Sequence, residues 1–433
     1  MKRKQPTYFN YLLCLGLTIS LALFSLGFIP PSTSQLASSS ISAATEVRGV
    51  WLTNVNSGVL FMPGAIERAL QQLAQLNFNT VYPVIWNRGH TFYPSNIAQQ
   101  VTGRKQEPLL SLTHPGTDVL AKIVQQGHHR GLRVIPWFEY GLIVPAKSNL
   151  VKQHPDWLTY NLPTSKTLAS ERLTEDLLEP SQSLTTYLTQ ITKYFRSNWT
   201  IKHIWLNPFH PEVQKFIKDL VVEVVTEYDV DGIQFDDHFG MPVEMGYDPY
   251  TVKLYQAQHQ GRKPPNNPYN EEWMRWRANK ISHFMAQIFQ AVKAVKPEAV
   301  VSVSPNPQDF SYRRYLQDWS SWVQWSLVDE IVLQVYRNDL NSFERQLSKP
   351  TLDFAKGRLP VSIGISSGTW QRPMNLDLIT QQINLARDRG FAGVSFFYWE
   401  SLWSYLTPEA PSRRRQGFQK IFETTLSSQN NEN

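Results

Sequence analysis

Cysteine is nearly absent from this chain of 433 residues: Cys14 is the only one, and it lies in an apolar stretch near the N-terminus. Everything that follows is free of cysteine. The absence excludes disulfide bonds and a thiol nucleophile, and oxidising surroundings would leave the folded part of the chain unchanged.

Charge is also scarce. Only 18% of residues are Asp, Glu, Lys or Arg, and the net charge is +6 with the basic residues scattered along the chain. This balance gives no basis for a nucleic-acid partner. Aromatic residues are abundant instead, with 14 Trp, 18 Tyr and 22 Phe. Many lie beside the ends of candidate strands, where flat rings can stack on a sugar, although most aromatic residues of any protein belong to its core.

The first 44 residues are typical of an export signal. Lys2, Arg3 and Lys4 precede an apolar stretch over residues 11–29, and Ser42-Ala43-Ala44 offers a small-x-small cleavage site before Thr45. The sequence therefore predicts export to the periplasm or cell surface. Because the apolar stretch is long and the cleavage site lies far beyond it, an uncleaved membrane anchor is the alternative.

Strand-like and helix-like segments alternate after residue 45, as in a parallel α/β sheet. Eight such units, whose strands end in polar or aromatic residues, predict a (β/α)₈ TIM-type barrel over residues 45–410, followed by a C-terminal helix and polar tail over 411–433. The expected strands are 48–53, 80–86, 133–140, 231–237, 300–305, 330–336, 360–366 and 393–399. The expected helices are 63–76, 117–130, 211–228, 271–296, 312–325, 341–355 and 375–389.

One connection is far longer than a single helix requires. The residues between the third and fourth strands, 141–230, predict an insertion on the mouth side of the barrel, with an amphipathic helix near 184–195. A second polar excursion, 240–270, follows the fourth strand.

The fourth strand carries the most informative motif, Asp-Gly-Ile-Gln-Phe-Asp-Asp at 231–237. Alternate residues of a strand share a face, so Gln234 and Asp236 are expected to point together toward the barrel axis. Asp237 then points the other way and orients a neighbour or caps the loop. Acids at the C-terminal ends of barrel strands face the mouth, where substrates bind. The alternative is a structural role without catalysis, in which the two carboxylates cap the next loop.

Two further acids end predicted strands. Glu139 follows the third strand, and neighbouring strands lie about 4.8 Å apart, so Glu139 and Asp236 are expected to meet. A pair of this kind divides glycoside hydrolysis between an acid and a nucleophile or base. Glu400 follows the eighth strand and is the rival acid. Glu139 would otherwise orient the network at the mouth, and Glu400 would otherwise cap its own loop.

Amide, hydroxyl and aromatic side chains at the strand ends suit sugar hydroxyls and sugar faces. His238 is a candidate proton shuttle, substrate donor or plain loop histidine. The other predicted binding residues are Asn54, Trp86, Trp137, Asn207, Asn306, Gln334, Tyr336, Trp370 and Trp399.

Five segments in this order resemble the glycosyl-hydrolase-like family 10 domain: 48–53, 205–208, 231–237, Val303-Ser304-Pro305 and Gln334-Val335-Tyr336. The resemblance covers residues 46–403. It implies a glycoside-hydrolase barrel of an exported bacterial protein, with cell-wall glycan stripped of stem peptides as the leading substrate. Asp236 also matches the nucleophile of the α-amylase superfamily. The glutamate that this superfamily carries after the fifth strand is missing, because Ser304-Pro305-Asn306 stands there.

The leading hypothesis is an exported glycoside hydrolase with Asp236 as nucleophile or base and Glu139 as acid. The alternative is a catalytically weak barrel that binds glycan at the cell wall, which the missing fifth-strand acid favours. A metal-dependent hydrolase using Asp236, Asp237 and His238 is disfavoured, because adjacent strand residues point to opposite faces. No Gly-x-Ser-x-Gly elbow supports a serine nucleophile. The sequence predicts no metal, no cofactor and a polysaccharide or oligosaccharide as partner.

Overall fold

The computed structural model describes residues 46–55, 57–162, 202–369, 372–403 and 407–431. Residues 45–433 form one compact unit. The predicted signal segment, the helix expected near 184–195 and Trp370 lie outside the described residues. None of the described helices is both long enough and apolar enough to span a membrane.

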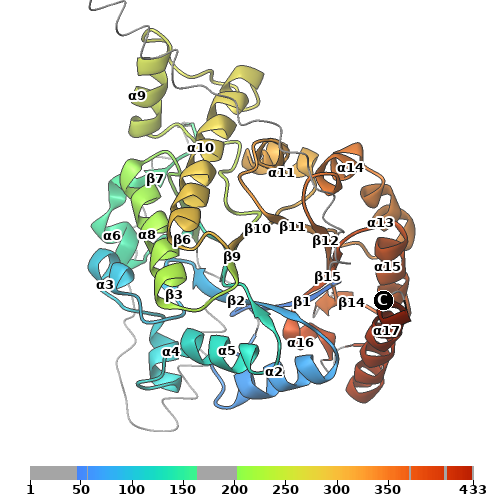
Figure 1. Cartoon of the computed structure of the whole chain (residues 1–433). Coiled ribbons are helices and arrows are strands. Elements are labelled where there is room, and N and C mark those ends of the chain that lie inside the picture. The colour runs from blue at the N-terminus through green and yellow to red at the C-terminus, as the bar shows by residue number, and fades with distance from the viewer. Residues whose placement is uncertain (1–45, 56, 163–201, 370–371, 404–406, 432–433) are drawn as a thin grey trace, which may run out of the picture. The chain divides into compact units, whose positions relative to one another are not determined.

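Eight parallel strands close into a barrel, which confirms the predicted (β/α)₈ architecture (Figure 1). Closure comes from β1, which pairs with both β2 and β15. The third strand is in two pieces, β4 and β5. The barrel strands are β1 (Val47–Leu52), β2 (Thr80–Asn87), β4 (Arg133–Val134), β5 (Trp137–Phe138), β9 (Gly232–Asp236), β10 (Val300–Ser304), β11 (Glu330–Gln334), β12 (Val361–Ser366) and β15 (Gly393–Phe397).

Helices form a ring around these strands (Figure 1). The helices of this ring are α2 (Ala65–Gln75), α3 (Asn96–Thr102), α4 (Pro108–Thr113), α5 (Val119–His128), α8 (Pro211–Glu227), α10 (Glu271–Val295), α11 (Gln308–Tyr315), α12 (Trp319–Gln324), α13 (Leu340–Leu347), α14 (Pro350–Lys356), α15 (Leu376–Asp388), α16 (Trp399–Leu402) and α17 (Pro411–Asn431). A further helix, α9 (Pro249–Gln258), lies outside the ring. Two short pairings complete the strands: β3 (His90–Thr91) on β2, and β13 (Gly368–Thr369) with β14 (Arg372–Pro373).

Two segments that the sequence predicts as one helix each form two separate helices in the structure. The one expected over 312–325 is α11 and α12, separated where Leu316 takes a left-handed conformation with φ +55°. The one expected over 341–355 is α13 and α14, because Pro350 begins a new helix and cannot continue the old one. Hydrophobic periodicity runs through both breaks, so it does not reveal them.

The insertion after the third strand builds a small antiparallel sheet. Its described elements are β6 (Ile143–Pro145), α6 (Asn149–Gln153), a 3₁₀ turn (Pro155–Trp157), β7 (Leu158–Thr159) and β8 (His203–Leu206), with β8 in the middle. The excursion after β9 carries α9, which stands away from the barrel ring beside the start of α10 in Figure 1. Arg277 of α10 is fully buried and donates to the backbone carbonyls of Val243, Met245 and Pro268.

The barrel interior confirms the predicted facing of the fourth strand. Gln234 accepts from the Trp51 indole at 2.7 Å and donates to Ser302 at 2.9 Å, so it points across the axis. Gly232 begins β9 because a Cβ there would lie 2.3 Å from the Val300 carbonyl oxygen of β10. The glycine of the motif therefore allows β9 and β10 to lie close together.

The C-terminal helix α17 covers part of the barrel wall. Phe418 and Phe422 are fully buried and meet Phe78 and Phe396 edge to face. Arg414 is also buried and donates to the backbone carbonyls of Leu402 and Met374. The first turns of α17 thus pack as part of the barrel layer.

Candidate active site

Asp236 and Glu139 lie side by side at the C-terminal end of the barrel. β5 pairs with β9 in the register Trp137 to Gln234 and Phe138 to Phe235, so the next residues along each strand are Glu139 and Asp236. Neighbouring strands are about 4.8 Å apart. The backbone N–H of Tyr140 donates to Asp236 Oδ2 at 3.1 Å, which holds the two strand ends together.

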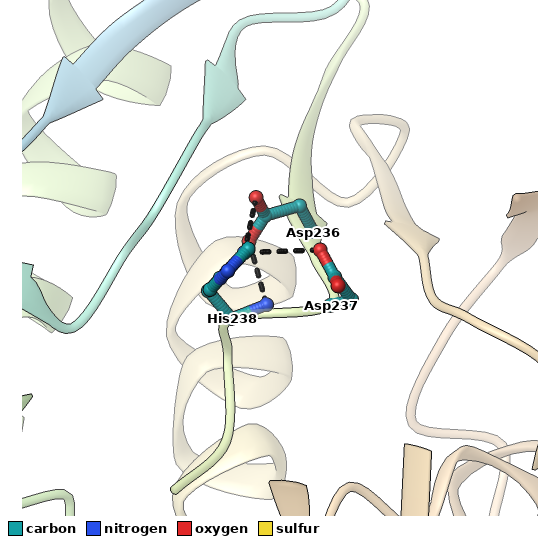
Figure 2. Close-up of side chains that lie close together, drawn as sticks. All are labelled: Asp236, Asp237 and His238. Atoms are coloured by element: carbon teal, nitrogen blue, oxygen red, sulfur yellow. Dashed lines mark hydrogen bonds and ion pairs between the residues drawn. The ribbon is translucent and has the colours of Figure 1, made fainter. Parts of the chain in front are cut away.

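Asp236, Asp237 and His238 form a tight cluster at the end of β9 (Figure 2). His238 Nδ1 lies 3.1 Å from Asp236 Oδ2 and 3.0 Å from Asp237 Oδ1. The expectation that the two aspartates point to opposite faces is therefore wrong. β9 ends at Asp236, so strand alternation no longer governs Asp237, and its side chain turns back to the same imidazole nitrogen.

The electrostatics of this cluster favour a protonated histidine between two acids. Burial by itself would lower the pKa of His238, but the charges of Asp237 and Asp236 outweigh it and hold the pKa well above its usual range. Burial raises the pKa of Asp236, and the His238 charge acts against that rise. Asp236 also accepts from the His238 and Tyr140 backbone N–H groups. Three donors on one carboxylate favour its ionised form.

Glu139 accepts hydrogen bonds from neutral donors in the described part of the chain. It is 3% exposed, and burial raises its pKa to about 8, with the nearby Asp236 charge adding to the rise. Thr53 Oγ1 donates to Glu139 Oε2 at 2.6 Å and Asn87 Nδ2 donates to the same oxygen at 3.1 Å. Both hydrogen bonds from described residues reach Oε2, so Oε1 is the atom suited to hold the proton.

Glu400 holds a loop rather than facing Asp236. Its Oε1 accepts from Ser57 Oγ at 2.5 Å and from the backbone N–H groups of Gly58 and Val59 at 3.0 and 3.1 Å. These residues follow β1, so Glu400 ties the loop after the first strand to α16. The alternative prediction is that Glu400 caps its own loop, after the eighth strand. It caps instead the loop after the first strand, which is distant in the sequence. Burial raises the pKa of Glu400, and no group in the described part of the chain donates a hydrogen bond to its buried Oε2.

Within the described ranges, Asp236, Asp237 and His238 are also a group that could hold a metal ion. Each offers one ligand atom, and these atoms lie within 4.8 Å of one another. The same His238 nitrogen already faces both carboxylates at hydrogen-bond distance. A metal ion would have to displace the proton that joins them. The geometry therefore suits a shared proton better than a metal ion.

Several predicted binding residues surround the acids. Asn306 donates to Asp237 Oδ2 at 2.5 Å. Tyr336 stacks on Phe397 at 5.7 Å, and burial followed by the charges of Asp237 and Asp236 raises its pKa well above the usual value. Asn54 accepts from Asn87 at 2.7 Å. Gln334 is half-buried and donates to the Ser304 carbonyl oxygen at 2.7 Å.

Two predicted binding residues point elsewhere. Trp86 is fully buried, donates to the Gly141 carbonyl oxygen and packs edge to face on Phe216 of α8. Asn207 is fully buried and uses its amide protons on Asp248 and Thr251, at 2.9 Å each. Both predictions are wrong, because these side chains join the insertion to its neighbours and do not face the mouth.

Two predicted tryptophans have intermediate positions. Trp137 is 3% exposed and packs against Trp51 at 6.1 Å inside the barrel, so it forms a floor beneath the acids rather than a stacking face. Trp399 begins α16, is half-buried and meets Trp403 edge to face at 4.9 Å.

Sequence reasoning gave no role to Thr53, Asn87, Tyr140 and Arg88, which the structure brings to the mouth. Tyr140 has φ +51° and its ring lies 4.4 Å from that of His238. The Arg88 guanidinium lies over the Tyr140 ring, with Cζ 5.2 Å from the ring centre. Position alone was the available signal, since each residue ends or directly follows a barrel strand.

A pocket of about 380 Å³ opens beside the acids, at the C-terminal ends of β10 and β11. Asn306 joins the pocket to the acid cluster through its bond to Asp237. Among its lining residues are Asn306, Phe310, Trp319, Arg337, Gln346 and Lys349. Phe310 is 47% exposed and offers a flat apolar face at its edge.

Comparisons with known proteins concern the family and the fold of the chain. The model of the family described as Glycosyl hydrolase-like 10 matches residues 46–194 and 174–385. The chain is 26% identical over 344 residues to the glycosyl hydrolase DigH of Escherichia coli O6:H1, covering 71% of this chain and 69% of that protein. It is 23% identical over 335 residues to the glycosyl hydrolase YngK of Bacillus subtilis, covering 67% of this chain and 54% of that protein.

Solved structures share the fold. The glycoside hydrolase domain of PgaB (BpsB) from Bordetella bronchiseptica superposes with a TM-score of 0.56 at 13% identity, covering 87% of this chain and 98% of that domain. The catalytic domain of a beta-amylase from Paenibacillus polymyxa gives 0.53 at 9% identity, covering 88% and 99%. At such identities the likeness concerns the barrel alone.

Proposed function

The chain belongs to the Glycosyl hydrolase-like 10 family, and we propose that it hydrolyses glycosidic bonds of a polysaccharide with Glu139 as general acid and Asp236 as nucleophile or base. Glu139 gives its proton to the leaving glycosidic oxygen. The Asp236 carboxylate attacks the anomeric carbon, or takes a proton from the water that does so. The leaving sugar departs with the proton from Glu139, and the bond to the anomeric carbon passes to Asp236 or to the water oxygen.

The contrast between the two acids carries this proposal. Burial raises the pKa of Glu139 to about 8, so its proton is present at neutral pH. Asp236 accepts three hydrogen bonds, one of them from a histidine whose pKa lies well above its usual range. Burial raises the pKa of both acids, but only Asp236 accepts a hydrogen bond from a charged group, which favours its ionised form. Neighbouring carboxyl groups in different environments are the arrangement that acid and base roles require.

The proposed substrate is bacterial cell-wall glycan free of stem peptides. The family resemblance supports this substrate class, and an exported position, which the first 44 residues predict, would give the enzyme access to it. Asn306, Tyr336 and Gln334 supply amide and hydroxyl groups around the acids for sugar hydroxyls. The adjoining pocket gives a polymer chain room beyond the acids.

Product release from the purified protein tests the proposal. Peptide-free peptidoglycan glycan and a panel of other polysaccharides are incubated with the wild type, Glu139→Gln, Asp236→Asn and Glu400→Gln. Both substitutions at the acid pair are expected to lower kcat about 10²–10⁴-fold, the usual worth of a positioned acid or base. Glu400→Gln is the matched control, since it is also a buried carboxyl with a raised pKa but keeps its loop acceptor.

Three results would contradict parts of the assignment. Loss of activity in Glu400→Gln with activity retained in Glu139→Gln would move the acid role to Glu400. Equal activity in the wild type and Asp236→Asn would remove Asp236 from the reaction. Glycan binding without any product, equal in the wild type and Asp236→Asn, would replace the hydrolase by a glycan-binding barrel.

A further inference from the structure

Arg88 is a half-buried cation at the mouth, and two of its three nitrogen atoms lack acceptors among the described residues. It follows Asn87, the last residue of β2, which donates directly to Glu139. Arg88 Nε and Nη1 are both buried, and no group in the described part of the chain accepts a hydrogen bond from either. Leaving a buried donor unpaired costs about 1–3 kcal/mol, and more when the donor is charged.

The guanidinium cannot relieve this cost by losing its proton, because arginine stays charged in proteins. Its Cζ atom lies 5.2 Å from the centre of the Tyr140 ring. That contact occupies the flat face of the guanidinium. The edges, which carry the N–H groups, remain without partners.

The backbone at Arg88 is strained as well. β2 and β3 are joined by a two-residue turn between the paired residues Asn87 and His90. Arg88 and Gly89 both have positive φ, at +52° and +82°. Turns of this kind favour Asn-Gly, and a left-handed conformation costs other residues about 1–2 kcal/mol. The chain thus places an arginine where asparagine would be more stable.

Among the described residues, Arg88 also forms no ion pair. Its electrostatic influence reaches Glu139, Tyr140 and His203. At neutral pH none of the three is an anion: the pKa of Glu139 is about 8, burial raises that of Tyr140, and burial with the Arg88 charge lowers that of His203. Asp236 and Asp237 already face His238.

We propose that Arg88 binds a carboxylate on the glycan, so that the enzyme acts on a polymer containing an acidic sugar. This inference rests on the proposed hydrolase function. The guanidinium offers two edges to a carboxylate, Nε with Nη2 and Nη1 with Nη2, and each includes one of the unpartnered nitrogens. Arg88 and His238 both lie close to the Tyr140 ring, and Arg88 directly follows Asn87, which donates to Glu139, so the carboxylate lies near the acid pair.

A binding measurement tests the inference without relying on catalysis. The melting temperature of the wild type and of Arg88→Gln is measured with two matched sugar pairs: N-acetylmuramic acid against N-acetylglucosamine, and glucuronic acid against glucose. The acidic member of one pair is expected to raise the melting temperature of the wild type, and neither member to raise that of Arg88→Gln. The pair that responds tells an ether-linked carboxylate from one on the ring. Equal shifts with acidic and neutral sugars would overturn the inference.

A rate measurement separates this inference from the proposed function. The substrates are the peptide-free glycan and the same glycan with its carboxylates converted to carboxamides. The wild type is expected to favour the carboxylate form at least tenfold in kcat/KM, mainly through KM. Arg88→Gln should cleave both forms at the rate at which the wild type cleaves the carboxamide. Arg358→Gln is the control, because Arg358 is an exposed cation that stacks on Phe354 away from the mouth.

The outcomes are distinct. A wild type that cleaves both forms alike would overturn the role of Arg88 and leave the hydrolase standing. Equal loss on both forms in Arg88→Gln would also overturn it, since Arg88 would then act through Glu139. A wild type inactive on both would refute the proposed function, and the melting-temperature pairs would then decide the role of Arg88 alone. Arg88→Gln is expected to fold, because it removes an unpaired half-buried charge.

Discussion

His238 decides how the two aspartates at the end of β9 coexist. Two buried carboxylates this close would repel each other, and one would take up a proton. The imidazole Nδ1 lies 3.1 Å from one and 3.0 Å from the other, and it carries the compensating charge. Asn306 donates to Asp237 and Tyr140 to Asp236, so each acid also has a partner of its own. These donors fix the direction of the Asp236 carboxylate beside Glu139 and favour its ionised form against the rise in pKa that burial causes.

The titration of Glu139 makes the free energy of unfolding depend on pH. Replacing Glu139 by Gln is expected to remove this dependence. Burial raises the pKa of Glu139 from 4.5 to about 8, so between these values the folded state holds a proton that the unfolded state has released. The free energy of unfolding therefore falls as pH rises through this window, by up to about 1.4 kcal/mol per unit, and levels off above it. Glu139→Gln is expected to lack that fall and to be the more stable protein at pH 9.

Denaturant unfolding of both proteins at pH 5, 7 and 9 measures the difference. The wild type and Glu139→Gln should nearly agree at pH 5 and diverge as pH rises. Parallel curves across the whole range would mean that Glu139 titrates near its ordinary pKa, and its proton would then be absent at neutral pH.

At the scale of elements, Arg277 fastens the excursion after β9. It lies on α10 and donates to three backbone carbonyl oxygens of residues 243–268, at 2.5–2.6 Å, with no carboxylate among these partners. Arg277→Met leaves these carbonyl groups unpaired, so we expect a loss of roughly 3 kcal/mol in unfolding free energy. Limited proteolysis should cut the variant within 240–270, where the wild type resists.

The half-buried Lys280, on the same helix, provides the comparison: it lies over the Trp276 ring at 5.3 Å, and Lys280→Met is expected to leave stability and cleavage unchanged. If Arg277→Met resists protease as the wild type does, the excursion is held by its other contacts. The network of Asn207, Asp248 and Thr251 would then be the element that positions it.

The sequence predicted each barrel strand closely because polar residues end apolar runs, and this also located Asp236 and Glu139. The predictions of side-chain direction failed where a local irregularity of the backbone turns a side chain to another side of its strand. The register between β2 and β5 shifts between Val84 and Trp86, so Trp86 turns toward α8 and Asn87 toward the acids. Arg88 and Tyr140 have left-handed backbones that no periodicity reveals. Asn207 ends a strand of the inserted sheet, not of the barrel, so the strand-end rule misplaced it.

At the scale of the whole molecule, the pocket beside Asn306 indicates a substrate longer than the sugars held by the acid pair. Phe310 is 47% exposed and lines this pocket from α11, the helix that follows the fifth strand. A sugar stacked on this ring gains about 1 kcal/mol, or roughly fivefold in affinity. Phe310→Ala is therefore expected to raise KM several-fold for long glycan chains and to leave KM unchanged for the shortest cleaved oligomer, with kcat unaffected for both.

Trp325→Ala is the matched control. Trp325 is 52% exposed, yet it follows α12 and precedes β11, at the end of the barrel where the strands begin. Its loss should change neither KM. A rise in KM for short and long chains alike in Phe310→Ala would mean that the pocket shapes the acid site itself. A dependence on chain length confined to Phe310 would mean that the polymer runs from the acid pair across the ends of β10 and β11, because only a chain that spans both regions can respond to a ring in one of them.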